Sequence, residues 1–217
     1  MNTAKLIHDT ILFVKQTLAD AEGGHDWFHI ERVYKNALLI AKSESCDTLV
    51  VQLGALLHDI ADSKFHGGDE TIGPRTARNF LESQHVAEEV IVHVVQIIEN
   101  ISFKGGKTKR KFSSIELDIV QDADRLDAIG AIGIARAFNY GGFKNRALYN
   151  PEFAPNLKMT KEEYKNSQAP TINHFYEKLL LLADKMNTKT GAAIAIKRHR
   201  YMENFLSQFY AEWEGEI

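Results

Sequence analysis

The sequence predicts an all-α protein. Apolar residues recur at helical spacings of three and four along most of the 217-residue chain, and strand-like alternation is nearly absent. With 44% hydrophobic and 25% charged residues, the composition is that of a globular protein with a substantial core. We expect a single domain over 1–217, with a helical core at about 20–140, an irregular excursion at about 141–170 and C-terminal helices at about 171–214.

The first helices are predicted from capping residues and apolar stripes. Thr3 and Asp47 are candidate N-caps for the first and third helices, and the third helix is expected to run through Ile60. The stripes of the first four helices are Ile7/Ile11/Val14/Leu18, Ile30/Val33/Tyr34/Ala37/Leu38/Ala41, Leu53/Leu56/Leu57/Ile60 and Val86/Val90/Ile91/Val94/Ile97/Ile98.

The second half begins with a candidate capping box. Ser113 and Glu116 have its spacing and are expected to open one long helix that ends near Gly141-Gly142. The excursion holds three of the four prolines, with a short helix expected near Thr160 to Tyr164. Helical spacing then resumes, and the last helix places four apolar residues on one face, namely Met202, Phe205, Phe209 and Trp213.

Charge and cysteine content exclude several classes of protein. The net charge of −3 argues against a stable nucleic-acid complex, which needs a basic surface. Cys46 is the single cysteine, so neither an intramolecular disulfide nor a thiolate metal site is expected. The N-terminus is amphipathic and does not look like a signal peptide, and no run is long enough to span a membrane. We expect a cytoplasmic protein without membrane contact, whose exposed helical faces allow a homodimer without requiring one.

The stretch LLHDIAD places His58 and Asp59 beside an apolar stripe. Burying an imidazole and a carboxylate there removes their hydration, and this loss must be offset by pairing or by a metal ion. Gly54 and Ala55, one turn earlier, leave room for an ion or for another helix. An interhelical Asp–His hydrogen bond is the alternative.

Two further stretches carry residues of the metal-ligand type. His29 lies one turn before Val33 and is expected to face inward, where it is either a ligand or a hydrogen-bonded core histidine. Asp122, Asp124 and Asp127 lie in a helix rich in alanine and glycine, which lets neighbouring backbones come close. A solvated acidic edge is the alternative, and spacing alone does not choose between Asp122 and Asp124.

The four groups His29, His58, Asp59 and Asp124 form a mixed nitrogen and oxygen donor set suited to Mn, Fe, Co, Ni or Zn, and less well to Mg. Their order and context resemble the H…HD…D pattern of the HD-domain metal-dependent phosphohydrolases. The resemblance lies in HDWFHIERV, LLHDIAD and DADRLD, and the ADRL context selects Asp124. It implies an all-α bundle with one divalent ion (Mn, Co, Ni, Fe or Mg) held by these four side chains.

The resemblance also implies a catalytic role for Asp62, since several HD phosphohydrolases carry an acid three residues after the HD doublet. That acid is commonly glutamate, so Asp62 reaches one methylene less far. Lys64 is a candidate for neutralising a phosphate. A solvated aspartate at a helix end and an exposed lysine are the alternatives.

A basic loop, SFKGGKTKRKF, is a candidate trap for a polyphosphate in this acidic protein. Trp27 and Phe28 could stack a base, although core packing is the commoner role of such residues. The expected substrate-binding residues are Lys104, Lys107, Lys109, Arg110, Lys144 and Arg146.

The resemblance extends to a bacterial subgroup with nucleotide pyrophosphohydrolases among its relatives. The expected function is hydrolysis of a nucleoside triphosphate to a nucleoside monophosphate and pyrophosphate. Monophosphatase or phosphodiesterase action, a di-iron oxidoreductase and a non-catalytic nucleotide-binding module are the alternatives. His93 stands without the second histidine of dinuclear relatives, which favours a mononuclear site.

Overall fold

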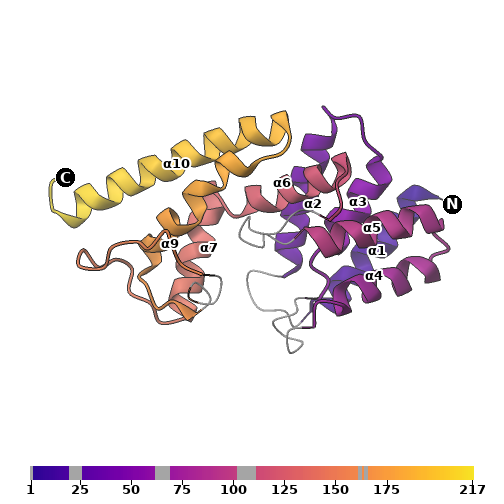
Figure 1. The fold of residues 1–217 in the computed structure, drawn as a ribbon, viewed down its shortest axis with the longest axis horizontal. Helices are drawn as coiled ribbons and strands as arrows, with labels where there is room; N and C mark the ends of the chain where they lie inside the picture. The colour runs from indigo at the N-terminus through magenta and orange to yellow at the C-terminus, as the bar shows by residue number, and fades with distance from the viewer. Residues whose placement is uncertain (1, 20–25, 62–68, 102–110, 161–162, 164–165) are drawn as a thin grey trace. The chain divides into compact units, whose positions relative to one another are not determined.

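The computed structural model describes residues 2–19, 26–61, 69–101, 111–160, 163 and 166–217. Within these ranges it contains helices and no strand, which confirms the all-α class (Figure 1). The chain forms two compact units, Met1–Asp124 and Arg125–Ile217. The helices are α1 (Thr3–Thr17), α2 (Trp27–Ala41), α3 (Thr48–Leu57), α4 (Ile72–Ser83), α5 (Glu88–Asn100), α6 (Ile115–Asp127), α7 (Gly130–Phe143), α9 (Thr171–Glu177) and α10 (Lys189–Trp213), with short 3-10 turns η2 (Leu179–Leu181) and η3 (Ala183–Lys185).

The capping residues were predicted in part. Asp47 caps α3 by accepting from the backbone N–H groups of Leu49 and Val50, as expected. For α1 the cap is Asn2 rather than Thr3. For α6 it is Ser114, whose hydroxyl accepts from the Leu117 N–H, so the predicted Ser113 capping box is wrong.

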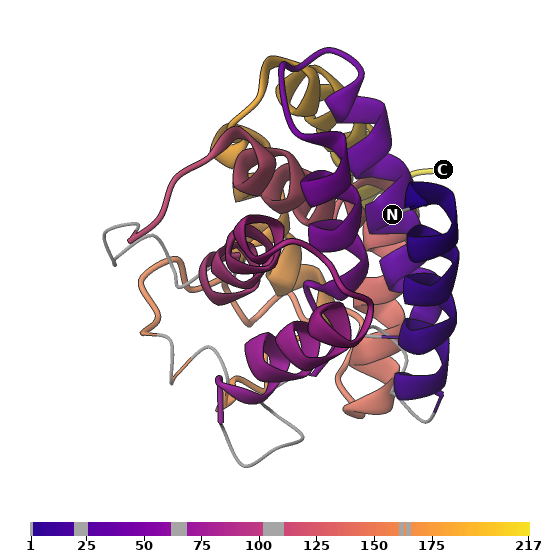
Figure 2. The same cartoon turned by 90° about the vertical axis from the view of Figure 1, so that its right-hand side faces the viewer.

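In the first unit, α3 packs against α1, α2 and α5. Figures 1 and 2 show α4 and α5 side by side, in agreement with their extensive contact. Every residue of α3 from Leu53 to Leu57 is buried. A Cβ on Gly54 would lie 3.2 Å from Ile97 Cδ1 and 3.5 Å from Val120 Cγ2. Of the two roles considered for Gly54, the structure therefore supports close helix packing.

The single long helix predicted from Ser113 to Gly141-Gly142 is wrong, because the chain breaks it between α6 and α7. Ile129 is extended, and Gly130 has a φ of +75°, a conformation that L side chains rarely adopt. A Cβ on Gly130 would also lie 3.0 Å from Cβ and Cγ of Arg198 in α10. Glycine is therefore required at this bend by both backbone conformation and packing.

Replacing Gly130 with alanine is expected to lower the free energy of unfolding by about 1–3 kcal/mol, because both the positive φ and the contact with Arg198 become strained. Urea denaturation followed by circular dichroism measures this loss. Gly142→Ala is the matched control, since a Cβ there meets nothing within 4 Å. Equal stabilities for the two variants would contradict the assigned bend.

Aromatic side chains form much of the packing in the second unit. The Phe205 ring lies about 5.9 Å from both Phe138 and Phe175, centroid to centroid, and Phe209 stacks on Trp213 at 6.1 Å. Met202 is fully buried, so the apolar stripe predicted for the last helix is confirmed. The irregular segment begins at residue 144 rather than 141, because α7 continues to Phe143. The short helix predicted near Thr160 to Tyr164 lies partly outside the described residues.

His174 in α9 gives the second unit a pH-dependent stability. Burial lowers the pKa of His174 to about 3, with the positive charges of Lys178 and Arg146 acting in the same direction. The folded state keeps this ring neutral, whereas the unfolded chain binds a proton below about pH 6.5. The stability that depends on the neutral ring is therefore present above pH 6.5 and is lost as the pH falls toward 3.

His174→Gln is expected to remove this dependence. Between pH 7 and 5 the wild type should lose about 2 kcal/mol more unfolding free energy than the variant, because the unfolded histidine takes up a proton over this range and the folded one does not. Urea titrations at pH 7, 6 and 5 with chelator present measure the difference. Parallel losses in both proteins would show that His174 is not held neutral.

Candidate metal centre

His29 is positioned by the start of α2. Asp26 is the N-cap, and its carboxylate accepts from the His29 backbone N–H at 2.9 Å. This cap places His29 in the first turn of the helix, where the residue is only 2% exposed. The prediction that His29 faces inward is therefore confirmed.

His58 and Asp59 lie just beyond the end of α3. The helix ends at Leu57 with His58 as its C-cap, so the prediction of a helix through Ile60 is wrong. The chain turns instead, with the Ile60 N–H donating to the Leu57 carbonyl at 3.2 Å. The backbone of His58 itself still has α-helical angles, with φ −58° and ψ −30°.

The His58 ring has a defined tautomer. Its Nδ1 lies 2.9 Å from the Ala55 carbonyl oxygen, and because a carbonyl only accepts, Nδ1 must carry the hydrogen. Burial lowers the pKa of His58, so the ring is neutral near pH 7. The Nε2 atom therefore presents a lone pair, and none of the described residues forms a hydrogen bond with this buried atom.

The two imidazoles lie together with carboxylates from two segments. Ring centroids of His29 and His58 are 5.4 Å apart, and His29, His58 and Asp59 each offer a ligand atom within 4.8 Å of the others. Asp124 Oδ1 from α6 lies 3.5 Å from His29 Nε2 and 3.9 Å from His58 Nε2. All four predicted ligands therefore belong to one cluster in the first unit.

Hydrogen bonds between the helices bring Asp124 to this cluster. Asn36 in α2 donates to the Ala123 carbonyl at 3.4 Å, and Gln121 donates to the Ile101 carbonyl at 3.0 Å. The Asp124 side chain is 40% exposed, whereas Asp122 is fully buried. Asp124 is the aspartate whose carboxylate lies within 4 Å of both histidines.

The residues present fit a divalent cation. Neighbouring ligands of an ion with bonds of about 2.1 Å lie about 3 Å apart, and the separations from Asp124 exceed this only modestly. A buried nitrogen such as His58 Nε2, which forms no hydrogen bond with the residues that the structure describes, destabilises the fold unless it acquires a partner. A cation accepts its lone pair, while the Ala55 carbonyl fixes the ring from the other side.

Of the predicted catalytic and substrate-binding residues, two lie in the second unit and the others lie outside the described residues. Lys144 and Arg146 belong to the second unit; Lys144 Nζ lies 4.9 Å from the Phe143 ring centroid, and Arg146 donates to the Ser167 carbonyl at 2.6 Å. Six of the predicted residues lie outside the described part of the chain, namely Asp62, Lys64, Lys104, Lys107, Lys109 and Arg110.

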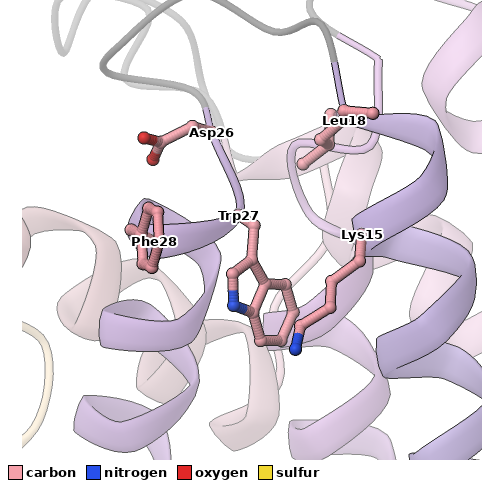
Figure 3. Close-up of a pocket in the computed structure, with 6 residues that line it drawn as sticks. Lys15, Leu18, Asp26, Trp27 and Phe28 are labelled. Carbon is pink, nitrogen blue, oxygen red and sulfur yellow. The ribbon is translucent and has the colours of Figure 1, made fainter.

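Trp27 and Phe28 differ in their environments (Figure 3). The Trp27 ring points toward α1, with Lys15 Nζ 4.7 Å from its centroid, whereas Phe28 is 62% exposed. They line a hollow of about 290 Å³ together with Asp26 and Leu18. The cation–π contact indicates a packing role for Trp27, and base stacking by either residue stays a prediction.

His93 has a different role from His29 and His58. Its Nε2 lies 2.9 Å from the Ser114 hydroxyl and 3.4 Å from Glu116 Oε2. Glu116 also accepts from the Asp47 N–H and so joins the start of α3 to that of α6. The His93 contacts join side chains that are 21 and 23 positions apart, and no local pattern predicts them. The Ala55 carbonyl that orients His58 is a backbone group, which leaves no pattern in a sequence.

Comparisons with known proteins agree with the fold and the cluster. The HD domain family matches residues 27–129, which contain all four clustered residues. The Bacillus subtilis protein YpgQ is 37% identical over 211 residues, 94% of this chain and 91% of that protein. The chain therefore belongs to the HD-domain superfamily of metal-dependent phosphohydrolases.

Solved structures support this assignment. A crystal structure of an HD-superfamily hydrolase from Bacillus thuringiensis is 43% identical, with a TM-score of 0.79 and coverage of 98% of this chain and 99% of that chain. Bacillus subtilis YpgQ has been solved in complex with ADP; that structure is 34% identical, with a TM-score of 0.77 and coverage of 98% and 97%.

None of the described helices combines the length and the apolar character needed to cross a membrane.

Proposed function

We propose that this protein hydrolyses nucleoside triphosphates to nucleoside monophosphates and pyrophosphate at a single divalent ion held by His29, His58, Asp59 and Asp124. The observation that carries the proposal is the buried, neutral His58 ring. Its Nε2 lone pair lies near a histidine and a carboxylate from other helices, and no residue in the described ranges forms a hydrogen bond with it. A buried nitrogen with an available lone pair is suited to coordinating a cation.

The donor set supports a transition metal ion such as Mn, Co, Ni or Fe, with Mg also compatible through its two carboxylates. When bound, the ion polarises a phosphoryl oxygen and makes water a stronger acid at neutral pH. An imidazole that gives its lone pair to a cation carries no charge, so two carboxylates would leave a divalent site formally neutral. An approaching polyphosphate then meets no net negative charge from the four ligands.

A nucleotide as the substrate is supported by the relative YpgQ, which was crystallised with ADP. In the proposed reaction a water molecule attacks the α-phosphorus, and the bond from that phosphorus to the oxygen bridging to the β-phosphate breaks. Asp62 takes the proton of the attacking water, and Lys64 neutralises phosphate charge. Lys104, Lys107, Lys109, Arg110, Lys144 and Arg146 are the candidates for holding the triphosphate.

A nucleotide screen tests the proposal. Triphosphates, diphosphates and monophosphates of the common bases are incubated with Mn²⁺, Co²⁺ or Mg²⁺, and products are separated by ion-exchange chromatography. The expected products are monophosphate and pyrophosphate, so a phosphate assay responds only after inorganic pyrophosphatase is added. Direct release of phosphate would instead indicate a monophosphatase or stepwise hydrolysis. Absence of turnover with every nucleotide and metal would contradict the proposed activity.

A further inference from the structure

A second hollow lies in the second unit, within Arg125–Ile217. It has a volume of about 390 Å³ and is lined by residues of the irregular segment after α7, of α9 and of α10. The three helices are labelled in Figure 1. Its lining includes Tyr149, Tyr176, Tyr210 and Asn173, with two prolines and a phenylalanine, and contains no charged residue. The volume and the mainly aromatic lining with few polar groups are typical of small-molecule sites.

The aromatic wall of this hollow is held in place by neighbouring rings. Tyr149 packs edge-on against Tyr210 and Trp213, with ring centroids 5.3 and 5.0 Å apart. Tyr176 and Tyr210 hydrogen-bond through their side chains. A wall fixed in this way loses little conformational entropy when a ligand binds.

Asn173 adds a polar group with unused hydrogen-bonding capacity. The residue is 1% exposed, and its Nδ2 donates to the Phe153 carbonyl at 2.9 Å, which defines the orientation of the amide. No hydrogen bond to its Oδ1 is formed by any residue in the described part of the chain. Because a carboxamide has two donor hydrogens, one donor and the Oδ1 acceptor remain for a ligand.

We propose that this hollow binds the base of an uncharged nucleoside, stacked against the tyrosine wall, with its edge hydrogen-bonded to Asn173. A carboxamide offers an adjacent donor and acceptor, the pattern complementary to the edge of a nucleobase such as adenine. The uncharged lining favours a nucleoside over a nucleotide. This site lies outside the metal centre and does not depend on the proposed catalytic activity.

Equilibrium dialysis of the full-length protein against adenosine, guanosine, cytidine and uridine in EDTA tests the site. Adenosine is expected to bind saturably at one site per chain, with a dissociation constant on the order of 0.1 mM for a ligand of its size. Binding should persist in His58→Ala, which disables the metal centre. AMP should bind more weakly than adenosine.

Ala154→Trp is the diagnostic variant, because Ala154 lines the hollow on an exposed irregular segment and a large side chain there occupies the ligand volume. It should weaken adenosine binding at least tenfold without changing the thermal midpoint. Ala87→Trp, at an exposed alanine before α5, is the control and should bind normally. The proposal is overturned if none of the four nucleosides binds saturably, if Ala154→Trp binds as well as the control, or if His58→Ala abolishes binding.

Discussion

His58→Ala is expected to reduce phosphohydrolysis by about a thousandfold or more and to remove the bound metal. The variant loses one nitrogen ligand, the one that the Ala55 carbonyl orients. A thousandfold effect corresponds to about 4 kcal/mol of transition-state stabilisation, within the range that a metal ion contributes. Metal content is measured by inductively coupled plasma mass spectrometry, and turnover by chromatography of the nucleotide products.

His85→Asn is the matched control for this loss. His85 is an exposed histidine with a φ of 55°, a conformation that asparagine tolerates well. The control should retain the metal and the activity of the wild type. A His58→Ala protein that keeps both would remove His58 from the metal centre.

Chelation of the metal is expected to lower the thermal midpoint by about 10 °C. An ion that binds only the folded state at a thousand times its dissociation constant adds about 4 kcal/mol, and each kcal/mol shifts the midpoint of a chain this size by about 2–4 °C. The physical reason is that the ion satisfies the buried Nε2 of His58, for which the described part of the chain supplies no hydrogen-bond partner. Differential scanning fluorimetry with Mn²⁺ and with EDTA measures the shift.

His58→Ala and His85→Asn separate this effect from nonspecific binding. The first variant should give the same midpoint with Mn²⁺ and with EDTA, and the second should shift like the wild type. A shift of equal size in His58→Ala would place the stabilising ion elsewhere on the protein.

The sequence predicted the helical class well, because it follows from local patterns. Apolar periodicity defined the helices, and the Asp47 side chain caps α3 as its position indicated. The break at Gly130 was not predicted, because it depends on contact with Arg198 of α10, far along the chain. In the sequence of an alanine- and glycine-rich run, a glycine that is required for its positive φ cannot be told from a glycine that allows close packing.

The residues of the metal centre could be chosen from the sequence, but their geometry could not. Histidines and aspartates beside apolar stripes indicated polar groups that lose water on folding and need a pairing partner or a metal ion. The resemblance selected Asp124 over Asp122. The distances from Asp124 to both imidazoles support that choice. The contact with the Ala55 carbonyl orients the His58 ring, and it depends on a backbone group that any residue carries.

Anomalous diffraction from crystals of the protein grown with Mn²⁺ would show whether one cation binds among the four side chains. We expect one anomalous peak per chain, in bonding contact with His29 Nε2, His58 Nε2 and a carboxylate oxygen from each of Asp59 and Asp124. Four side chains that point apart, with no anomalous peak between them, would contradict this expectation.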